Sequence, residues 1–411
     1  MAGCRAAAGS NRGRKRRQAM RHLALALMLL CLVPLAGRAQ APADFYDPQG
    51  LGASWGRPGK LLRTAHLPGA PLGATAHRIL YQSVGLDGRA IPVSGVVIVP
   101  PGPAPASGRP VVAWAHPTTG VEDQCAPSRA QAFFASVQGL DAMLQRGYVV
   151  AATDYPGLGM PGPHPYLVGV SEGRAVLDSV RAARTLPQAR AGNSFAVWGH
   201  SQGGQAALFT GLLARTYAPD LKLVGVAAAA PATELSALLA DDIATSGGRN
   251  LTAMTLWSWS QIYDAPLGDV VVPEAIPTIQ RLADDCIESV FDVFARLGPT
   301  RALQRAFLKS EQFYDKQPWR GLLQRNTPGL LPRGVPLFLA QGTADDLVRP
   351  QVTRDYADRQ CRAGRSVDML WLPDVGHLFA ARDGAEQAIS WMADRFAGLP
   401  AAGNCVAPAP Y

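Results

Sequence analysis

The stretch Phe195-Ala-Val-Trp-Gly-His-Ser-Gln-Gly-Gly204 contains the pattern Gly-x-Ser-x-Gly, with Ser201 at its centre. An apolar, strand-like segment precedes Ser201, and a helix-like segment follows it from Gln205 to Leu213. This is the context of a nucleophile elbow, where flanking glycines allow a tight turn to present a serine in a strained conformation. The chain has 42 glycines among 411 residues, so the pattern also arises by chance. Whether this pattern marks a catalytic serine depends on finding the other catalytic residues elsewhere in the chain.

Short apolar runs alternate with helix-like segments along the chain, which predicts an α/β fold with a mostly parallel, doubly wound sheet. The strands are expected at Val93 to Val99, Val111 to Ala115, Tyr148 to Thr153, Phe195 to Trp198, Leu223 to Ala229, Pro336 to Ala340 and Val367 to Leu372. The helices are expected at Ser128 to Gln145, Ser171 to Thr185, Gln202 to Tyr217, Gln351 to Ala363 and Ala385 to Phe396.

Residues 231–335 interrupt this alternation, because they show amphipathic stretches and no convincing buried strand. We expect a helical cap here, inserted into a core formed by residues 40–230 and 336–411. Ligands of such sheets bind beyond the carboxyl ends of the strands, so the insertion would cover Ser201. Trp257 and Trp259 are candidates for an apolar lid over a substrate pocket, or alternatively for the core of the insertion itself.

The net charge of +8 is confined to the start of the chain, where eight basic residues precede the first acidic one, Asp44. Without residues 1–39 the chain has 31 basic and 31 acidic residues, so no nucleic-acid partner is expected. A basic region, an apolar run from Leu23 to Leu35 and small residues at Gly37 and Ala39 predict a signal peptide over residues 1–39. The alternative is a membrane anchor, but this run is shorter than the roughly 20 residues of a spanning helix. We therefore expect an exported protein, periplasmic or extracellular, with no integral membrane segment after cleavage.

Four cysteines remain after the predicted cleavage. An even number in an exported chain favours two disulfide bonds, and the spacings match no metal site. Four cysteines allow three pairings, which the spacing does not resolve. They are Cys125, Cys286, Cys361 and Cys405.

A serine nucleophile needs a histidine base and a carboxylate that orients it. In α/β-hydrolases these follow the serine in the order acid, then histidine, on loops after the last strands. His377 follows the expected final strand and is the predicted base. Asp345 best fits the acid position in a segment that leaves a strand through glycine, with Asp346 and Asp374 as nearby alternatives.

The tetrahedral intermediate of acyl transfer needs backbone N–H donors for its oxyanion. We expect these from Gln202, directly after the nucleophile, and from Thr118, because the preceding Pro117 has no N–H. Alternatively, the loop that contains Thr118, after the expected strand Val111 to Ala115, is a plain structural turn. The predicted substrate pocket includes His116, Asp154 and Tyr155, although Asp154 would equally serve to hold its own glycine-rich loop.

Taken together, these segments resemble the secretory lipase family, the lipase A-like group of α/β-hydrolases, over most of the mature chain. The motifs that carry the resemblance are Trp114-Ala-His-Pro-Thr-Thr-Gly120, Cys125-Ala-Pro-Ser128, Ala152-Thr-Asp-Tyr-Pro-Gly-Leu-Gly159, His164-Pro-Tyr166, Val176-Leu-Asp-Ser-Val-Arg-Ala-Ala-Arg184 and Gly199-His-Ser-Gln-Gly203. The resemblance implies an α/β-hydrolase fold with a Ser-Asp-His triad, a helical lid over an acyl pocket, and disulfides Cys125 with Cys286 and Cys361 with Cys405. Family members commonly carry glycine where this chain has Pro117, so the preferred acyl chain does not follow from the resemblance.

These observations predict a secreted serine lipase or carboxylesterase that cleaves carboxylic esters without cofactor or metal. Its expected partners are an ester or lipid substrate and, through the cap, a transient lipid interface. Other candidate functions are a peptidase or acyltransferase on the same scaffold, since the triad does not choose the leaving group or the acceptor. A non-catalytic binding protein on the same fold is a further alternative.

Overall fold

The computed structural model describes residues 45–49, 51, 56–288, 292 and 297–405. The chain divides into two compact units, 1–40 and 41–411, and all described residues belong to the second. The predicted signal peptide lies outside the described residues. Among those residues, no helix combines the length and apolar character needed to cross a membrane.

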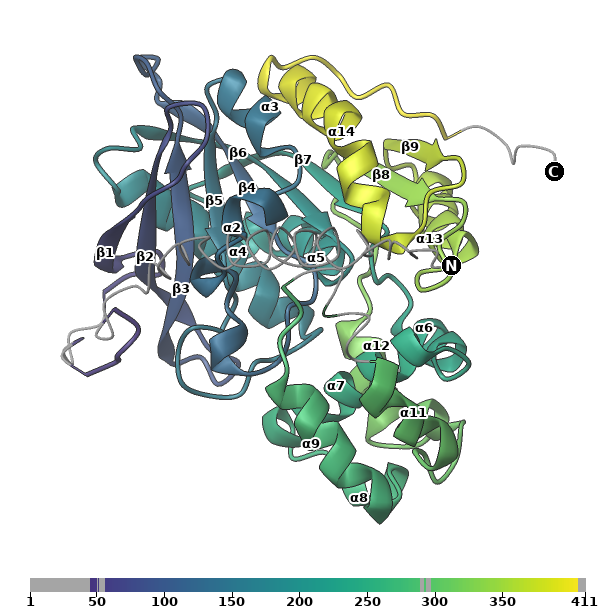
Figure 1. The fold of residues 1–411 in the computed structure, drawn as a ribbon. Coiled ribbons are helices and arrows are strands. Elements are labelled where there is room, and N and C mark those ends of the chain that lie inside the picture. Colours follow the sequence, from purple (N-terminus) through teal and green to yellow (C-terminus); the bar gives the residue numbers. More distant parts are fainter. Residues whose placement is uncertain (1–44, 50, 52–55, 289–291, 293–296, 406–411) are drawn as a thin grey trace, which may run out of the picture. The chain divides into compact units, whose positions relative to one another are not determined.

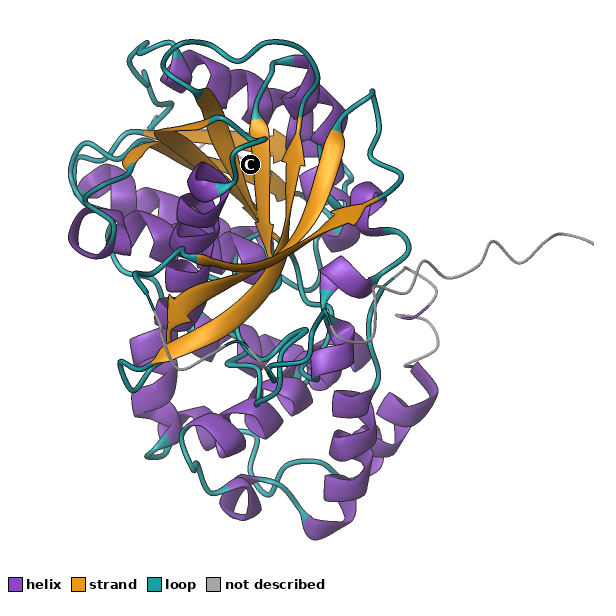
Figure 2. Ribbon diagram, turned by 90° about the vertical axis from the view of Figure 1, so that its left-hand side faces the viewer, coloured by secondary structure: helices purple, strands orange, loops and turns teal. Residues whose placement is uncertain are grey.

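Nine strands of the described chain form one sheet in the order β1-β2-β3-β5-β4-β6-β7-β8-β9 (Figures 1 and 2). β1, β2, β3 and β5 pair antiparallel in turn, whereas the pairs from β5 through β4 to β9 are all parallel. The mostly parallel sheet is thus confirmed, with two further N-terminal strands that were not predicted. The strands are β1 (Leu61–Leu67), β2 (Thr75–Val84), β3 (Ala90–Val99), β4 (Arg109–Ala115), β5 (Val149–Thr153), β6 (Ala191–His200), β7 (Lys222–Ala229), β8 (Leu337–Gly342) and β9 (Val367–Leu372).

The central strands are apolar on both faces because helices cover both sides of the sheet. In β4, Val112 and Trp114 belong to one buried cluster, while Val111 and Ala113 belong to the other. This alternation follows from the two-residue period of a strand. One face packs against α4 (Gly169–Thr185), α5 (Gln202–Tyr217) and α13 (Pro350–Arg362), and the other against α3 (Leu140–Gln145) and α14 (Ala380–Phe396).

The segment between β7 and β8 is helical where it is described, and it gathers at one end of the sheet, at the lower right in Figure 1. Its helices pack on one another, with α7 in contact with α6, α9 and α11. The helices are α6 (Leu235–Asp242), α7 (Ser246–Ile262), α8 (Leu267–Val270), α9 (Ile276–Asp284), α11 (Leu297–Arg305) and α12 (Trp319–Asn326).

The single helix predicted from Ser128 to Gln145 is wrong. The structure has a short 3-10 turn, then α2 (Phe133–Ser136) and α3, with Gly139 at φ 79° directly before α3. A Cβ at Gly139 would also overlap Ile389 of α14. The left-handed backbone and this close approach together end the helical run.

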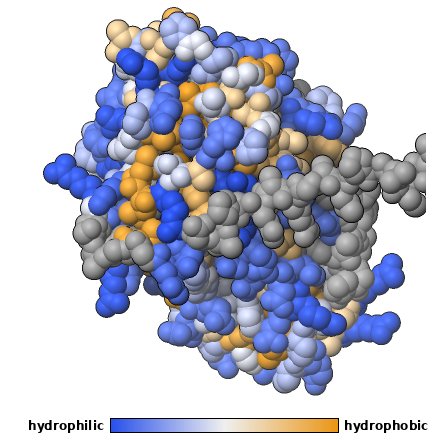
Figure 3. Space-filling view, turned by 60° about the vertical axis from the view of Figure 1, so that its left-hand side comes forward, coloured by the Kyte–Doolittle hydropathy of each residue, from blue (hydrophilic) through white to orange (hydrophobic). Residues whose placement is uncertain are grey.

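Two disulfide bonds, Cys125–Cys286 and Cys361–Cys405, join distant parts of the chain, in the pairings implied by the resemblance. The first ties the loop after β4 to the segment after α9, and the second ties α13 to the C-terminal tail. Hydrophilic side chains dominate the face drawn in Figure 3, where they surround a strip of hydrophobic ones.

Candidate active site

Ser201 lies in the turn between the end of β6 and the start of α5. Its backbone has φ 56° and ψ −116°, a conformation that non-glycine residues rarely adopt. The Ser201 N–H donates to the Ala229 carbonyl at 2.9 Å, and the Ser201 carbonyl accepts from the Gln205 N–H at 3.1 Å. These two bonds hold the strained residue between β7 and α5.

The glycines of the motif permit close backbone approach. A Cβ at Gly199 would overlap the carbonyl of Gly203, and a Cβ at Gly203 would overlap the carbonyl of Ala115, where β4 ends. Positions 199 and 203 therefore require glycine, because any side chain there would collide with neighbouring backbone.

The structure brings the three predicted triad residues into one hydrogen-bonded array. Ser201 Oγ lies 2.9 Å from His377 Nε2, and His377 Nδ1 lies 2.9 Å from Asp345 Oδ2. All three side chains are buried. Asp345 comes from the loop after β8 and His377 from the loop after β9, so the carboxyl ends of neighbouring parallel strands deliver them to Ser201.

Asp345 is held on both carboxylate oxygens. Oδ2 also accepts from Gln341 Nε2 at 3.0 Å, and Oδ1 accepts from the backbone N–H groups of Leu347 at 3.0 Å and Val348 at 2.8 Å. Burial alone raises the pKa of Asp345, but the nearby His377 and these N–H donors outweigh burial and leave the pKa below its ordinary value. The alternatives Asp346 and Asp374 are exposed.

His200 supports the loop that carries His377, a contact that sequence reasoning missed. His200 Nε2 donates to the His377 carbonyl at 3.0 Å, and the two rings are 5.0 Å apart. Burial, with His377 beside it, lowers the pKa of His200 to about 3. This neutral ring adds no positive charge beside His377.

Thr118 and Gln202 both lie at cavities that contain Ser201. Gln202 is the first residue of α5, where backbone N–H groups lack partners within the helix. The Thr118 hydroxyl bonds to the Tyr166 hydroxyl at 2.9 Å, which fixes the loop after β4. Two elements thus bring the predicted oxyanion donors toward Ser201.

A buried polar network fixes the side chain of Gln202. Its Nε2 donates to Glu172 Oε1 at 2.8 Å and to His164 Nε2 at 3.1 Å. His164 Nδ1 in turn donates to the Pro156 carbonyl at 2.8 Å, which leaves Nε2 free to accept. Burial raises the pKa of Glu172 to about 8 and lowers that of His164 to about 3, so both side chains are largely neutral at pH 7. Nothing in the sequence around Glu172 or His164 distinguishes a buried ionisable residue from one at the surface.

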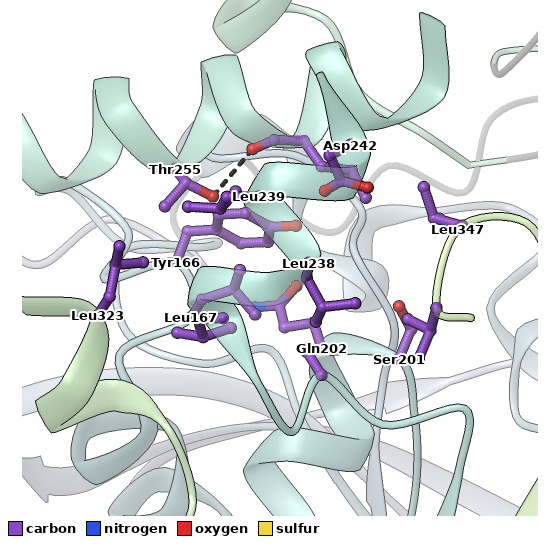
Figure 4. A pocket seen from close by; sticks show the side chains of 14 residues that line it. Tyr166, Leu167, Ser201, Gln202, Leu238, Leu239, Asp242, Thr255, Leu323 and Leu347 are labelled. Carbon is purple, nitrogen blue, oxygen red and sulfur yellow. Dashed lines mark hydrogen bonds between the residues drawn. The ribbon is translucent and has the colours of Figure 1, made fainter. Parts of the chain in front are cut away.

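Two spaces meet at Ser201. The outer cavity, of about 360 Å³, is lined by Ser201, His377, Pro117, Thr118, Leu251 and Leu378, among others. The inner pocket lies under α6 and α7, has a volume of about 30 Å³, and is lined by Ser201, Gln202, Tyr166, Leu238, Leu239, Asp242, Thr255 and Leu347, among others (Figure 4). His116, one of the predicted pocket residues, and Pro117 line the outer cavity.

Asp154 and Tyr155, predicted as pocket residues, line neither space. Asp154 is buried and accepts from Ser94 Oγ at 2.6 Å and from the Ser128 N–H at 2.9 Å. Tyr155 is fully buried and donates through its hydroxyl to the His116 carbonyl at 3.2 Å. Both residues hold loops together, which was the alternative interpretation of Asp154.

Neither of the two tryptophans predicted for the lid lines the outer cavity or the inner pocket. Trp259 is fully buried and its indole N–H donates to the Tyr166 carbonyl at 2.8 Å, so it belongs to the core. Trp257 faces a separate hollow beside Glu122 and Gln261. On α7 the residues that reach the two spaces are Gly247, Asn250, Leu251 and Thr255, which share a helix face at spacings of three and four.

A sequence model of the secretory lipase family matches residues 129–404. The chain belongs to the secretory lipase family. As a member it is a carboxylic ester hydrolase, and the family's name together with the two disulfides marks it as an exported protein.

Individual family relatives are distant. Lipase 10 of Candida albicans is 25% identical over 93% of this chain and 86% of its own length. A probable inactive lipase of Mycobacterium tuberculosis is also 25% identical, over 88% of this chain and 84% of its own. The structure of Candida antarctica lipase A superposes with a TM-score of 0.73 at 18% identity, over 91% of this chain and 90% of that one, and so shares the α/β-hydrolase fold.

Proposed function

We propose that this secretory lipase hydrolyses carboxylic esters through an acyl-enzyme on Ser201. The observation that carries the proposal is the hydrogen-bonded array from Ser201 Oγ through His377 to Asp345, at the start of α5 and at the meeting point of two spaces. A serine hydrogen-bonded to a histidine that a carboxylate orients is the arrangement that activates a hydroxyl at neutral pH.

In the first half of the reaction, Ser201 Oγ bonds to the ester carbonyl carbon while its proton passes to His377 Nε2. The backbone N–H groups of Thr118 and Gln202 stabilise the negative oxygen of the tetrahedral intermediate. The bond to the alcohol oxygen then breaks, and that oxygen takes the proton from His377. Water repeats the sequence on the acyl-enzyme, which releases the acid and restores Ser201.

The lining residues support an assignment of the two parts of the ester to the two spaces. His377, which must protonate the leaving alcohol, lines the outer cavity and not the inner pocket. Of the two proposed oxyanion donors, Gln202 lines the inner pocket and Thr118 the outer cavity, so the oxyanion lies where the two spaces meet. The alcohol therefore occupies the outer cavity and the acyl group the inner pocket, under a cap formed by residues 231–335. The small inner pocket favours short acyl groups.

The apolar side chains beside the site suggest where a lipid surface would touch. Leu378 and Phe379 directly follow His377 and are 46% and 40% exposed. They belong to the α/β core, so contact with lipid would involve this rim rather than the cap alone.

The test of the proposal is a Ser201→Ala variant assayed on p-nitrophenyl esters from acetate to palmitate. Turnover should fall by on the order of 10³-fold or more, and wild-type activity should be highest on the shortest chains. Ser179→Ala, which removes a buried hydroxyl of α4, is the matched control and should keep full activity. Undiminished turnover in Ser201→Ala would refute the proposal.

Three alternative functions can be told apart from ester hydrolysis by experiment. A peptidase would cleave p-nitroanilides at rates comparable to esters, and an acyltransferase would give more transfer product than acid when an alcohol is added. A catalytically silent protein, as the name of the Mycobacterium relative suggests for that protein, would not react with a fluorophosphonate probe. Labelling that is lost in Ser201→Ala would exclude this last reading.

A further inference from the structure

Asp242 places a buried carboxyl group in the wall of the inner pocket. It is the last residue of α6 and is 6% exposed. Within the described part of the chain its carboxyl group makes no hydrogen bond and no ion pair. Figure 4 shows it beside Leu347, on the same pocket as Ser201.

Among the described residues, the other polar side chains of this pocket are already hydrogen-bonded, except for Oε1 of Gln202, which is buried without a partner. The Thr255 hydroxyl donates to the Leu251 carbonyl at 2.9 Å, the Tyr166 hydroxyl bonds to Thr118, and the Gln202 amide bonds to Glu172. The remaining lining near Asp242 is leucine and valine. A polar group buried in apolar surroundings without a partner is costly, and a protein that keeps one commonly uses it for a ligand.

The charges around Asp242 favour its neutral form. Burial, the neighbouring Asp241 and the more distant Asp345 raise the pKa of Asp242, against the effect of Arg349, and bring it to about 8. Asp241 is itself paired with Arg349 at 2.9 Å. At neutral pH the Asp242 carboxyl is therefore mostly protonated, with one O–H donor and one carbonyl acceptor facing the pocket.

We infer that Asp242 selects esters whose acyl group carries a hydroxyl, which the Asp242 carboxyl binds in the inner pocket. The inference rests on the proposed function, because it assigns the acyl group to this pocket. The pocket volume of about 30 Å³ is the space of about one water-sized group, so only the hydroxyl-bearing end of a short acyl chain would enter it beside Asp242. A site built to bind a substrate hydroxyl discriminates strongly against the analogue that lacks it, since the buried carboxyl then stays unpaired.

The experiment compares ethyl butyrate with both enantiomers of ethyl 2-hydroxybutyrate and ethyl 3-hydroxybutyrate, by pH-stat titration at pH 7. The wild type should prefer at least one hydroxy ester by about 10-fold or more in kcat/KM. Asp242→Leu should abolish this preference and raise kcat/KM for ethyl butyrate. Asp242→Asn, which keeps one donor and one acceptor, should retain part of the preference and covers the case in which the leucine variant does not fold.

Asp241→Asn is the matched control, since it changes the adjacent charge outside the pocket and should keep the preference. Equal wild-type rates on plain and hydroxy esters would overturn the inference, as would a preference that survives in Asp242→Leu. Neither result would affect the proposed function if butyrate hydrolysis still depended on Ser201. Loss of all ester hydrolysis in the wild type would instead remove the proposed function.

Discussion

Replacing Asp345 by asparagine tests the triad by exchanging one carboxylate oxygen for an NH₂ group. All four hydrogen bonds to the Asp345 carboxylate come from donors: His377 Nδ1, Gln341 Nε2, and the backbone N–H groups of Leu347 and Val348. An asparagine offers one oxygen and one NH₂ group. Whichever way it turns, its NH₂ group faces at least two donors.

The magnitude follows from which donors are left unpaired. With the amide oxygen toward the backbone N–H groups, the NH₂ group faces His377 Nδ1, which can then accept only if the ring proton moves to Nε2. That tautomer donates toward Ser201 Oγ and cannot take its proton. We expect kcat to fall by about 10⁴-fold, or about 5.4 kcal/mol in the activation free energy. The unpaired Gln341 donor should lower the free energy of unfolding by about 1–3 kcal/mol.

The assay is steady-state hydrolysis of p-nitrophenyl acetate together with urea unfolding of the same preparations. Asp346→Asn is the matched control, because this neighbouring carboxylate is exposed and should be replaceable without effect. A fall of less than 10-fold in Asp345→Asn, with the fold intact, would show that this carboxylate does not set the tautomer of His377.

Three further outcomes follow from contacts and charges. Gly203→Ala should destabilise the fold by several kcal/mol and lower activity in proportion to the misplaced elbow, since its Cβ would overlap the Ala115 carbonyl; thermal unfolding and ester turnover measure both. Glu172 is ionised above about pH 4.5 when unfolded but stays protonated up to about pH 8 when folded, so wild-type stability should fall as pH rises between these values, by up to about 1.4 kcal/mol per pH unit. Buried Asp242 has a similarly raised pKa and adds to the same fall, so Glu172→Gln should show a smaller slope in urea titrations from pH 5 to 8, and an unchanged slope would contradict the buried, neutral state of Glu172. Replacing Cys361 and Cys405 by serine should cost about 3–4 kcal/mol, because the closed loop spans 44 residues; an equal unfolding midpoint with and without the disulfide would exclude this.

The parallel half of the fold was predictable because its strands are buried on both faces and stand out as apolar runs. β1 escaped prediction because exposed and partly buried residues mix along this edge strand, and β2 because its buried positions include the polar residues Arg78, Gln82 and Ser83. The helix break at Gly139 depends on a close contact with Ile389, a residue 250 positions away. The residues next to Gly139 in the sequence therefore could not predict it.

The reacting residues were predictable for a related reason: the order of serine, acid and histidine along the chain follows from the order of the strands. The pocket was not. Whether Trp259 faces a ligand or the core depends on the rotation of α7, and the same aromatic pattern fits both. Asp242 and Glu172 look like surface carboxylates in the sequence, and only tertiary packing buries them.

The most direct test of the account is to trap the acyl-enzyme. Wild-type protein and Ser201→Ala are mixed with p-nitrophenyl butyrate, quenched in acid within milliseconds, digested and analysed by mass spectrometry. The account predicts one butyryl group on the wild-type peptide that contains Ser201 and none in the variant. Turnover without this adduct in Ser201→Ala, or a butyryl group on another residue, would contradict it.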